Sequence, residues 1–249
     1  PEGGQRRAVN LMRAEAALDG ALRACHMSPM TIERISVRGD GGFALPVLHA
    51  RPQGARRGSV IVIQEIFGLT DHIAEMTQAF ADAGYDTFAP GLFERVEPGF
   101  LAGHDAAGMD KGRAAVAATS WPQVVADLQA VIDQATHPVY VTGFCWGGAA
   151  SWIAAARCKG VAAASCFYGR LIADLLDDKP QAPVMLHYGA ADPAIPMENV
   201  ERVRAAMPLS PLYLYDAGHG FCRPGSTDYN AEARELSLKR TFDWFARWR

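Results

Sequence analysis

The sequence predicts a protein of the α/β class, with helices on both faces of a mostly parallel sheet. Short apolar segments alternate with segments of helical periodicity along most of the chain, which is typical of strand–helix–strand crossovers. The segment SVIVI at residues 59–63 is rich in β-branched side chains, as in strands that are buried on both faces. A chain of 249 residues can bury roughly three quarters of its unfolded surface, so we expect a domain that needs no disulfide or metal to fold.

The N-terminal part of the chain predicts a helix and then a hairpin. Apolar side chains recur at helical spacing over residues 5–25, and the Ser-Pro pair at residues 28–29 ends this pattern. Apolar and polar residues alternate around residues 35–37. The turn sequence Asp-Gly-Gly at residues 40–42 then leads into a second strand over residues 43–50, which completes the predicted hairpin.

The rest of the chain alternates strands and helices to its end. The predicted strands are residues 59–63, 86–89, 139–144, 161–168, 184–188 and 212–215, and the predicted helices are residues 71–84, 111–118, 122–135, 147–157, 197–207 and 228–247. Residues 90–110 contain four glycines and are predicted to be a loop. We expect residues 30–249 to form one domain and residues 1–29 a helical appendage, part of which would precede a natural start at Met30.

Composition and charge exclude several classes of protein. Lysine and arginine number 24 and aspartate and glutamate 27, a net charge of −3, so we expect no nucleic-acid partner and no membrane binding through basic residues. No apolar segment approaches the roughly 18 residues of a membrane span. The five cysteines are irregularly spaced without a Cys-x-x-Cys pair, so the sequence predicts no disulfide, metal or other cofactor. Free thiols favour a cytoplasmic protein, which we expect to be a monomer or a small homo-oligomer.

The strongest motif places a cysteine between glycines where a buried strand meets a helix. Residues 139–148 read VYVTGFCWGG, so Gly143 and Gly147 flank Cys145 as in the G-x-S-x-G elbow of serine hydrolases, with cysteine in place of serine. Such a turn has no room for side chains at its flanks, and it lifts the central side chain above the sheet. The N-terminus of the following helix favours a thiolate and later an oxyanion. The alternative is a buried structural cysteine beside a glycine-rich turn.

A cysteine nucleophile needs a base and an acid that orients the base, and after this type of elbow the acid comes first in the chain. Two histidines follow Cys145. His187 lies in an apolar strand, where a core histidine is expected, whereas His219 lies in a loop after the last predicted strand, where catalytic groups collect. Asp192 directly follows a strand and is the preferred acid. Asp216 is its rival, and the alternative role of Asp192 is to cap the next helix.

Gln64 and Glu65 follow the buried strand at residues 59–63, at the same edge of the predicted sheet as Cys145. A charged group at that position is costly unless it is paired. Glu65 is therefore a candidate for the site, and the alternative is a solvated carboxylate in a loop.

Four segments together resemble the dienelactone hydrolase (carboxymethylenebutenolidase) family. They are QEIFG at residues 64–68, GFCWGG at 143–148, GAAD at 189–192 and AGHGF at 217–221. The resemblance runs from about Thr31 to the C-terminus. It implies an α/β-hydrolase fold with a Cys-His-Asp triad, which falls on Cys145, His219 and Asp192.

The same resemblance implies roles for five further residues. Glu65 would contact the resting thiol and take part in its activation. The backbone N–H groups of Ile66 and Trp146 would form the oxyanion hole. Arg223 would bind a substrate carboxylate, with Tyr168 below the site, and the alternative is that Arg223 only packs against the loop that follows it.

Two features depart from the family pattern. Gly220 stands where the family has a serine directly after the histidine. A second substrate-binding arginine and its accompanying aromatic residues are not recognisable, although Lys111 or Arg113 could stand in for the arginine. Dienelactone is therefore less firmly implied as the substrate than ester or lactone hydrolysis in general.

The sequence thus predicts a hydrolase that cleaves a small ester or lactone through Cys145 and a thioester acyl-enzyme. A thiolate itself leaves more readily than a simple alkoxide. A thiolate nucleophile therefore suits substrates with a good leaving group, such as an enolate. Two alternatives stay open. One is a carboxylesterase of the same fold with broad specificity for small acyl groups, and the other is a non-catalytic binding protein of that fold.

Overall fold

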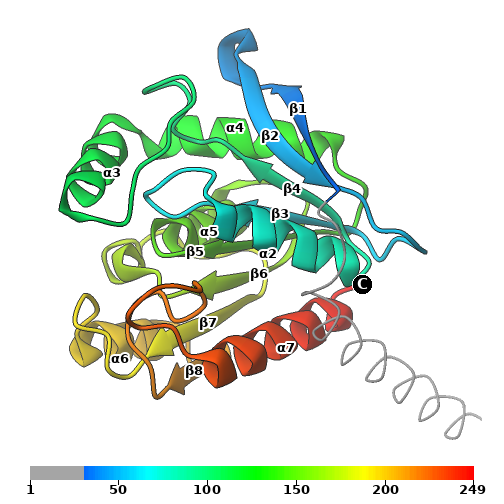
Figure 1. The fold of residues 1–249 in the computed structure, drawn as a ribbon. Coiled ribbons are helices and arrows are strands. Elements are labelled where there is room, and N and C mark those ends of the chain that lie inside the picture. The colour runs from blue at the N-terminus through cyan, green and yellow to red at the C-terminus, as the bar shows by residue number, and fades with distance from the viewer. Residues whose placement is uncertain (1–30) are drawn as a thin grey trace, which may run out of the picture.

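An eight-stranded sheet organises the chain (Figure 1). In this computed structural model, which describes residues 31–249, the strands lie in the order β1-β2-β4-β3-β5-β6-β7-β8. β1 pairs with β2, and β2 with β4, in antiparallel fashion, and all other neighbours are parallel. The mostly parallel sheet and the hairpin of β1 and β2 confirm the prediction, whereas the predicted appendage at residues 1–29 lies outside the described residues.

The elements follow the predicted alternation. The strands are β1 (Ile32–Arg38), β2 (Ala44–Ala50), β3 (Ser59–Ile63), β4 (Asp86–Pro90), β5 (Val139–Phe144), β6 (Val161–Phe167), β7 (Val184–Gly189) and β8 (Leu212–Tyr215). The helices are α2 (Asp71–Asp82), α3 (Ala106–Ala118), α4 (Trp121–Gln134), α5 (Trp146–Arg157), α6 (Met197–Ala206) and α7 (Ala231–Arg247), with the short 3₁₀ helices η1 (Asp40–Gly42) and η2 (Arg170–Asp174).

Two helix starts correct the prediction. The loop predicted over residues 90–110 ends early, because α3 begins at Ala106, where the Asp105 side chain caps it by accepting a hydrogen bond from the Gly108 N–H at 2.8 Å. The last helix begins at Ala231 rather than residue 228, because Asn230 caps it through the Ala233 N–H at 3.0 Å. In both cases a capping side chain, rather than the apolar periodicity, sets the boundary.

Helices cover both faces of the sheet, as the sequence predicts. Alternate side chains of β3 serve the two faces: Val60 and Val62 pack in a core with α2 and α7, and Ile61 and Ile63 pack in a core with α4 and α5. In Figure 1, α2 and α7 lie in front of the sheet and α4 and α5 behind it. Within the described residues no helix combines the length and apolarity that a membrane crossing requires.

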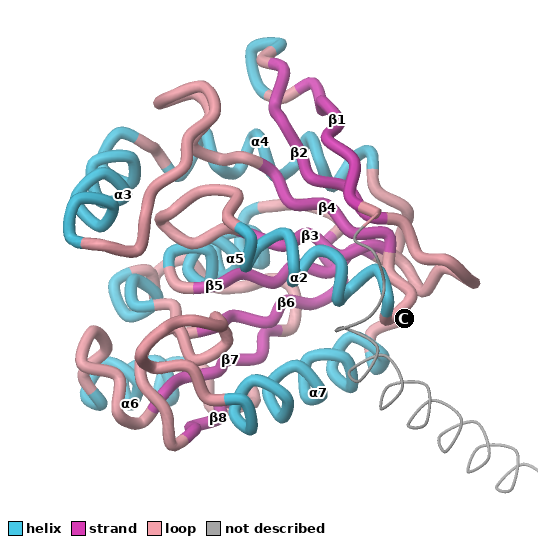
Figure 2. Tube along the Cα trace, in the orientation of Figure 1, coloured by secondary structure: helices cyan, strands magenta, loops and turns pink. Residues whose placement is uncertain are grey.

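The strand register brings the ends of the parallel strands to one edge of the sheet. Ile63 of β3 pairs with Gly143 of β5, and Phe144 of β5 pairs with Phe167 of β6. The loops that follow β3, β5, β6, β7 and β8 therefore open at the same edge, which lies on the left in Figure 2. Ligand sites of parallel sheets form outside the carboxyl ends of the strands, so this edge is where a site is expected.

Candidate active site

Cys145 lies at the turn from β5 into α5 with a positive φ of 56°. A residue with a side chain adopts such a φ only where its surroundings impose it. A Cβ atom at Gly147 would collide with the backbone oxygens of Ile63 and Gln64, and one at Gly143 would collide with the Gly147 oxygen. The turn is therefore as tight as the motif predicts, and Cys145 projects from it.

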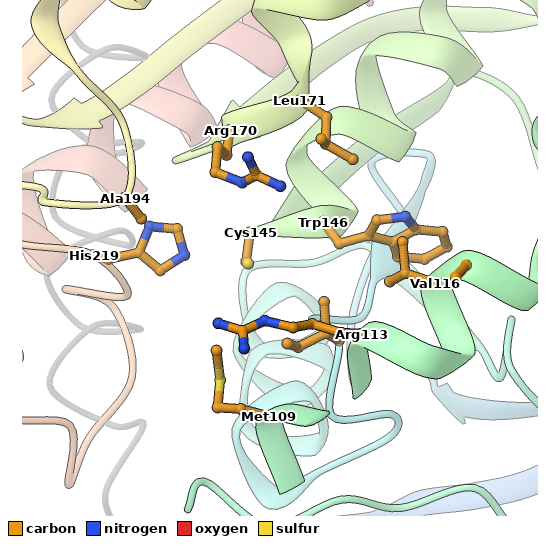
Figure 3. A pocket seen from close by; sticks show the side chains of 11 residues that line it. Met109, Arg113, Val116, Cys145, Trp146, Arg170, Leu171, Ala194 and His219 are labelled. Carbon is orange, nitrogen blue, oxygen red and sulfur yellow. The ribbon is translucent and has the colours of Figure 1, made fainter. Parts of the chain in front are cut away.

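The Cys145 side chain opens into a pocket of about 570 Å³ at the carboxyl edge of the sheet. Figure 3 shows the sulfur at its centre, with His219 on one side and the Trp146 ring on the other. The pocket is lined by Ile66, Met109, Arg113, Val116, Ala117, Cys145, Trp146, Arg170, Leu171, Ala194 and His219. Within residues 31–249 no group of three or more His, Cys, Asp and Glu side chains is arranged to hold a metal ion.

Asp192 holds the His219 ring. Its Oδ2 lies 2.7 Å from Nδ1 of His219, its Oδ1 accepts the Ala194 N–H at 2.8 Å, and its side chain is 0% exposed. The next helix begins instead from Pro196, so Asp192 is not its cap. The rival, Asp216, is exposed, and among residues 31–249 its side chain has no hydrogen-bond partner, while its backbone carbonyl accepts from the Asn230 side chain.

The surroundings of His219 favour its charged form. Burial alone would lower the pKa of His219, but hydrogen bonds with Asp192 and with Cys145, together with the charges of both groups, outweigh burial and raise it to about 10. The protonated His219 ring thus lies between the buried Asp192 carboxylate and the Cys145 sulfur.

His187 belongs to the core, as its apolar strand predicts. It is 0% exposed, and its ring nitrogens lie 2.8 Å from the Tyr215 hydroxyl and 3.1 Å from the Ser165 hydroxyl. Burial lowers the pKa of His187 to about 3, so the ring is neutral. Its place on β7 keeps it away from the residues that line the pocket.

Glu65 is buried, faces Arg223, and is not among the residues that line the pocket. Its Oε2 lies 3.7 Å from Nη1 of Arg223, too far for a hydrogen bond, and no described residue donates to this oxygen. Burial raises the pKa of Glu65, although the charges of Arg223 and His219 oppose the rise. The Arg223 guanidinium also lies 5.4 Å from the centre of the Phe67 ring, and Arg223 is not among the residues that line the pocket.

The predicted oxyanion donors lie beside the sulfur. Ile66 and Trp146 both line the pocket. Trp146 is the first residue of α5, so its N–H has no partner within the helix. No backbone carbonyl of the described chain accepts the N–H of Ile66.

Tyr168 follows β6 with a positive φ of 36° and is 0% exposed. Its ring meets the His219 ring edge-on, with ring centres 5.2 Å apart. Burial raises the pKa of Tyr168 well above its usual range, and no described residue bonds its hydroxyl. Tyr168 therefore supports the His219 ring from the side of the sheet.

Sequence reasoning missed Met109 and Val116 in the pocket wall and named Arg113 only as a possible stand-in for a family arginine. Met109, Arg113 and Val116 share one face of α3 at spacings of four and three residues, but the predicted helix began only at residue 111 and left Met109 in the predicted loop. Arg113 thus faces the pocket, whereas Lys111 donates to Glu97 and to the Leu101 carbonyl, each at 2.9 Å.

Arg170 and Leu171 were also missed. They begin η2 directly after β6, at the same edge of the sheet as Cys145. The available signal was their position just after a parallel strand and close to Tyr168, which the sequence had already placed below the site.

Comparison with known proteins decides the family. Residues 45–248 match the model of the dienelactone hydrolase family. The chain belongs to this family. It is therefore a hydrolase with the α/β-hydrolase fold, which excludes the non-catalytic alternative.

Individual relatives in the dienelactone hydrolase family agree with this assignment. A carboxymethylenebutenolidase from Pseudomonas putida is 30% identical over 231 residues, covering 87% of this chain and 97% of the relative. A protein from Escherichia coli (strain K12) named "Putative carboxymethylenebutenolidase" is 35% identical over 228 residues, covering 82% and 83%.

A solved structure shows the same fold. The "Putative Dienelactone Hydrolase" of Klebsiella pneumoniae subsp. pneumoniae MGH 78578 superposes with a TM-score of 0.79 at 31% identity, covering 89% of this chain and 100% of that chain. Sequence and structure comparisons thus lead to the same family.

Proposed function

We propose that the protein hydrolyses a small ester or lactone through a Cys145 thiolate and a thioester acyl-enzyme. The observation that carries the proposal is the 2.7 Å contact between Asp192 and His219, combined with the presence of His219 and Cys145 in one pocket. Nucleophile, base and orienting acid then come from the ends of β5, β8 and β7 in the order that this fold requires.

In the first half of the reaction the Cys145 thiolate adds to the carbonyl carbon and the carbonyl oxygen becomes an oxyanion. In this proposal the N–H groups of Ile66 and Trp146, two residues that line the pocket, bind this oxyanion, and each such donor contributes on the order of 100- to 1,000-fold in rate. The C–O bond then breaks, the leaving oxygen takes the proton from His219, and a thioester remains on Cys145.

In the second half His219 takes a proton from water, and the resulting hydroxide adds to the thioester. The C–S bond breaks, the carboxylic acid leaves, and the sulfur returns as a thiolate beside a protonated His219. Asp192 keeps the ring proton on Nδ1, so that Nε2 is the nitrogen that exchanges protons.

Glu65 is proposed to take part in activating the resting thiol. Its support is its burial opposite Arg223 and its elevated pKa, which burial causes and the charges of Arg223 and His219 oppose. A buried carboxyl group with a raised pKa is a candidate to accept the proton of the thiol, and the charge of Arg223 opposes that protonation.

The pocket is compatible with the proposed substrate class. Its volume of about 570 Å³ suits a small ester or lactone. The name carboxymethylenebutenolidase, carried by the relatives, points to an unsaturated lactone with a carboxylate. The broader carboxylesterase remains the second candidate, because Arg223, the predicted carboxylate ligand, faces Glu65 at 3.7 Å.

A panel of p-nitrophenyl acetate, p-nitrophenyl butyrate and dienelactone tests this proposal. Wild type should hydrolyse at least one of them, Cys145→Ala should lose turnover, and Cys158→Ser, a change at a buried cysteine outside the pocket, should keep most of it. Cys145→Ser should be weak, because an alcohol is harder to deprotonate than a thiol. Turnover at the wild-type rate by Cys145→Ala would refute the proposal.

A further inference from the structure

The pocket in front of Cys145 carries an unbalanced positive charge. Of the 11 residues that line it, Arg113 and Arg170 are arginines and none is aspartate or glutamate, while the charge of protonated His219 is matched by the Cys145 thiolate beside it. Most of the others are apolar and add no charge of either sign, so the two arginine charges are not offset by the pocket lining. A cleft of this kind attracts anionic ligands.

Neither arginine is neutralised by the described chain. The Arg113 guanidinium has one ion pair, 3.4 Å from Asp110, in which the side chains are 68% and 78% exposed, so the pair holds Arg113 weakly. Arg170 is exposed and forms no side-chain hydrogen bond or ion pair with residues 31–249. Arg223 differs from both, since its side chain is 17% exposed and faces buried Glu65.

The two guanidinium groups lie on opposite sides of the Cys145 sulfur in Figure 3. Arg113 extends from α3 and Arg170 from the start of η2, on two separate walls of the pocket. A substrate carbonyl on the sulfur would send its acyl part toward one wall and its leaving group toward the other. Each guanidinium can then meet a different end of the substrate.

We propose that Arg113 and Arg170 select dianionic substrates, with one carboxylate on the acyl part and another on the leaving group of the scissile ester or lactone. This inference rests on the proposed function. A guanidinium pairs with a carboxylate through charge-assisted, often bidentate hydrogen bonds, and no other lining residue offers such a donor. In this proposal Arg170 determines specificity: it binds the substrate and takes no part in bond cleavage.

Four matched esters test the proposal. The first is p-nitrophenyl butyrate, which is neutral. The second replaces the butyryl group by a hemisuccinyl group, the third carries a carboxylate on the nitrophenol ring, and the fourth combines both changes. The measured quantity is kcat/KM for each charged ester divided by kcat/KM for the neutral ester, which removes any general effect on catalysis.

Wild type should prefer the doubly charged ester. Arg113→Gln should lower the preference for one singly charged ester by about 10-fold or more, and Arg170→Gln should lower it for the other, as expected for a charge-assisted hydrogen bond. Each variant should also lower the preference for the doubly charged ester. Arg204→Gln is the matched control, because Arg204 is also exposed and also pairs at i,i+3, with Glu201 on α6 away from the pocket.

Three results would overturn the proposal: wild type hydrolysing charged esters no faster than the neutral one, both variants losing preference for the same singly charged ester, or Arg204→Gln losing as much as Arg170→Gln. Failure of the proposed function is distinguishable from these. In that case the neutral ester would not be hydrolysed, or Cys145→Ala would hydrolyse it as fast as wild type.

Discussion

Replacing Asp192 by asparagine removes one acceptor from a buried position that uses two. Oδ2 accepts a hydrogen bond from Nδ1 of His219 at 2.7 Å, and Oδ1 accepts one from the Ala194 N–H at 2.8 Å. Asparagine offers one acceptor oxygen and one donor NH₂ group. If its oxygen keeps the Ala194 bond, its NH₂ group faces Nδ1, and the single proton of the neutral ring moves to Nε2. A ring in that state cannot take a proton at Nε2.

The opposite amide orientation keeps the productive ring but leaves the Ala194 N–H without an acceptor. A fully buried unsatisfied donor costs about 1–3 kcal/mol, and because the Ala194 N–H is only part-buried, this orientation is disfavoured by at most about 150-fold. The lost carboxylate charge adds to this effect, because Asp192 is one of the groups that raise the pKa of His219 to about 10. Together these effects predict a fall in kcat/KM of about 1,000- to 10,000-fold.

The assay is the kcat/KM of purified Asp192→Asn for p-nitrophenyl acetate at neutral pH, with thermal unfolding as the check that it folds. Asp216→Asn is the matched control, because Asp216 is exposed and its side chain bonds no residue of the described part of the chain, so this variant should stay within about twofold of wild type. A folded Asp192→Asn enzyme with near-wild-type activity, or a larger loss in Asp216→Asn, would refute the reasoning.

Three further changes test other parts of the structure. His219 has a pKa of about 10 in the folded protein and 6.5 ordinarily, so its contribution to stability is complete below about pH 6.5 and is lost as the pH rises through about 10. In urea unfolding, the difference in unfolding free energy between wild type and His219→Gln should therefore shrink over that pH range. A difference that stays constant would contradict this prediction. Gly147→Ala should lower the unfolding free energy by about 3 kcal/mol or prevent folding, because its Cβ would collide with backbone atoms. Gly54→Ala, which has open space around it, should change the unfolding free energy little. Equal urea midpoints for the two variants would contradict this prediction. Arg223→Ala should lower kcat/KM equally for neutral and carboxylated esters, since Arg223 faces Glu65, and a loss confined to carboxylated esters would restore its predicted role as a carboxylate ligand.

Much of the fold was predictable because each central strand is buried on both faces. The segment at residues 59–63 is fully buried in the structure, and its apolar residues could therefore mark it without any alignment. The start of α3 was not predictable from the same signal, because it is set by the Asp105 cap within a glycine-containing segment. The order of the strands, with β4 between β2 and β3, depends on tertiary pairing that periodicity does not record.

The candidate site was predictable for those residues that closely follow a strand. Cys145, Asp192 and His219 each lie just after a parallel strand, so the shared edge of the sheet brings them together. The partner of Arg223 was not predictable, because Glu65 and Arg223 are distant in the chain and meet only through the packing of two loops. For Arg170, the sequence showed the position but not that its neighbours are apolar and leave its charge unpaired.

The most direct measurement is mass spectrometry of the enzyme quenched in acid during turnover of p-nitrophenyl butyrate. The account predicts a butyryl group on the peptide that contains Cys145, removable by neutral hydroxylamine as a thioester is, and absent from Cys145→Ala. His219→Gln should slow both its formation and its loss, because His219 protonates the leaving group and activates water. A butyryl group on another residue, or full turnover by Cys145→Ala, would contradict the account.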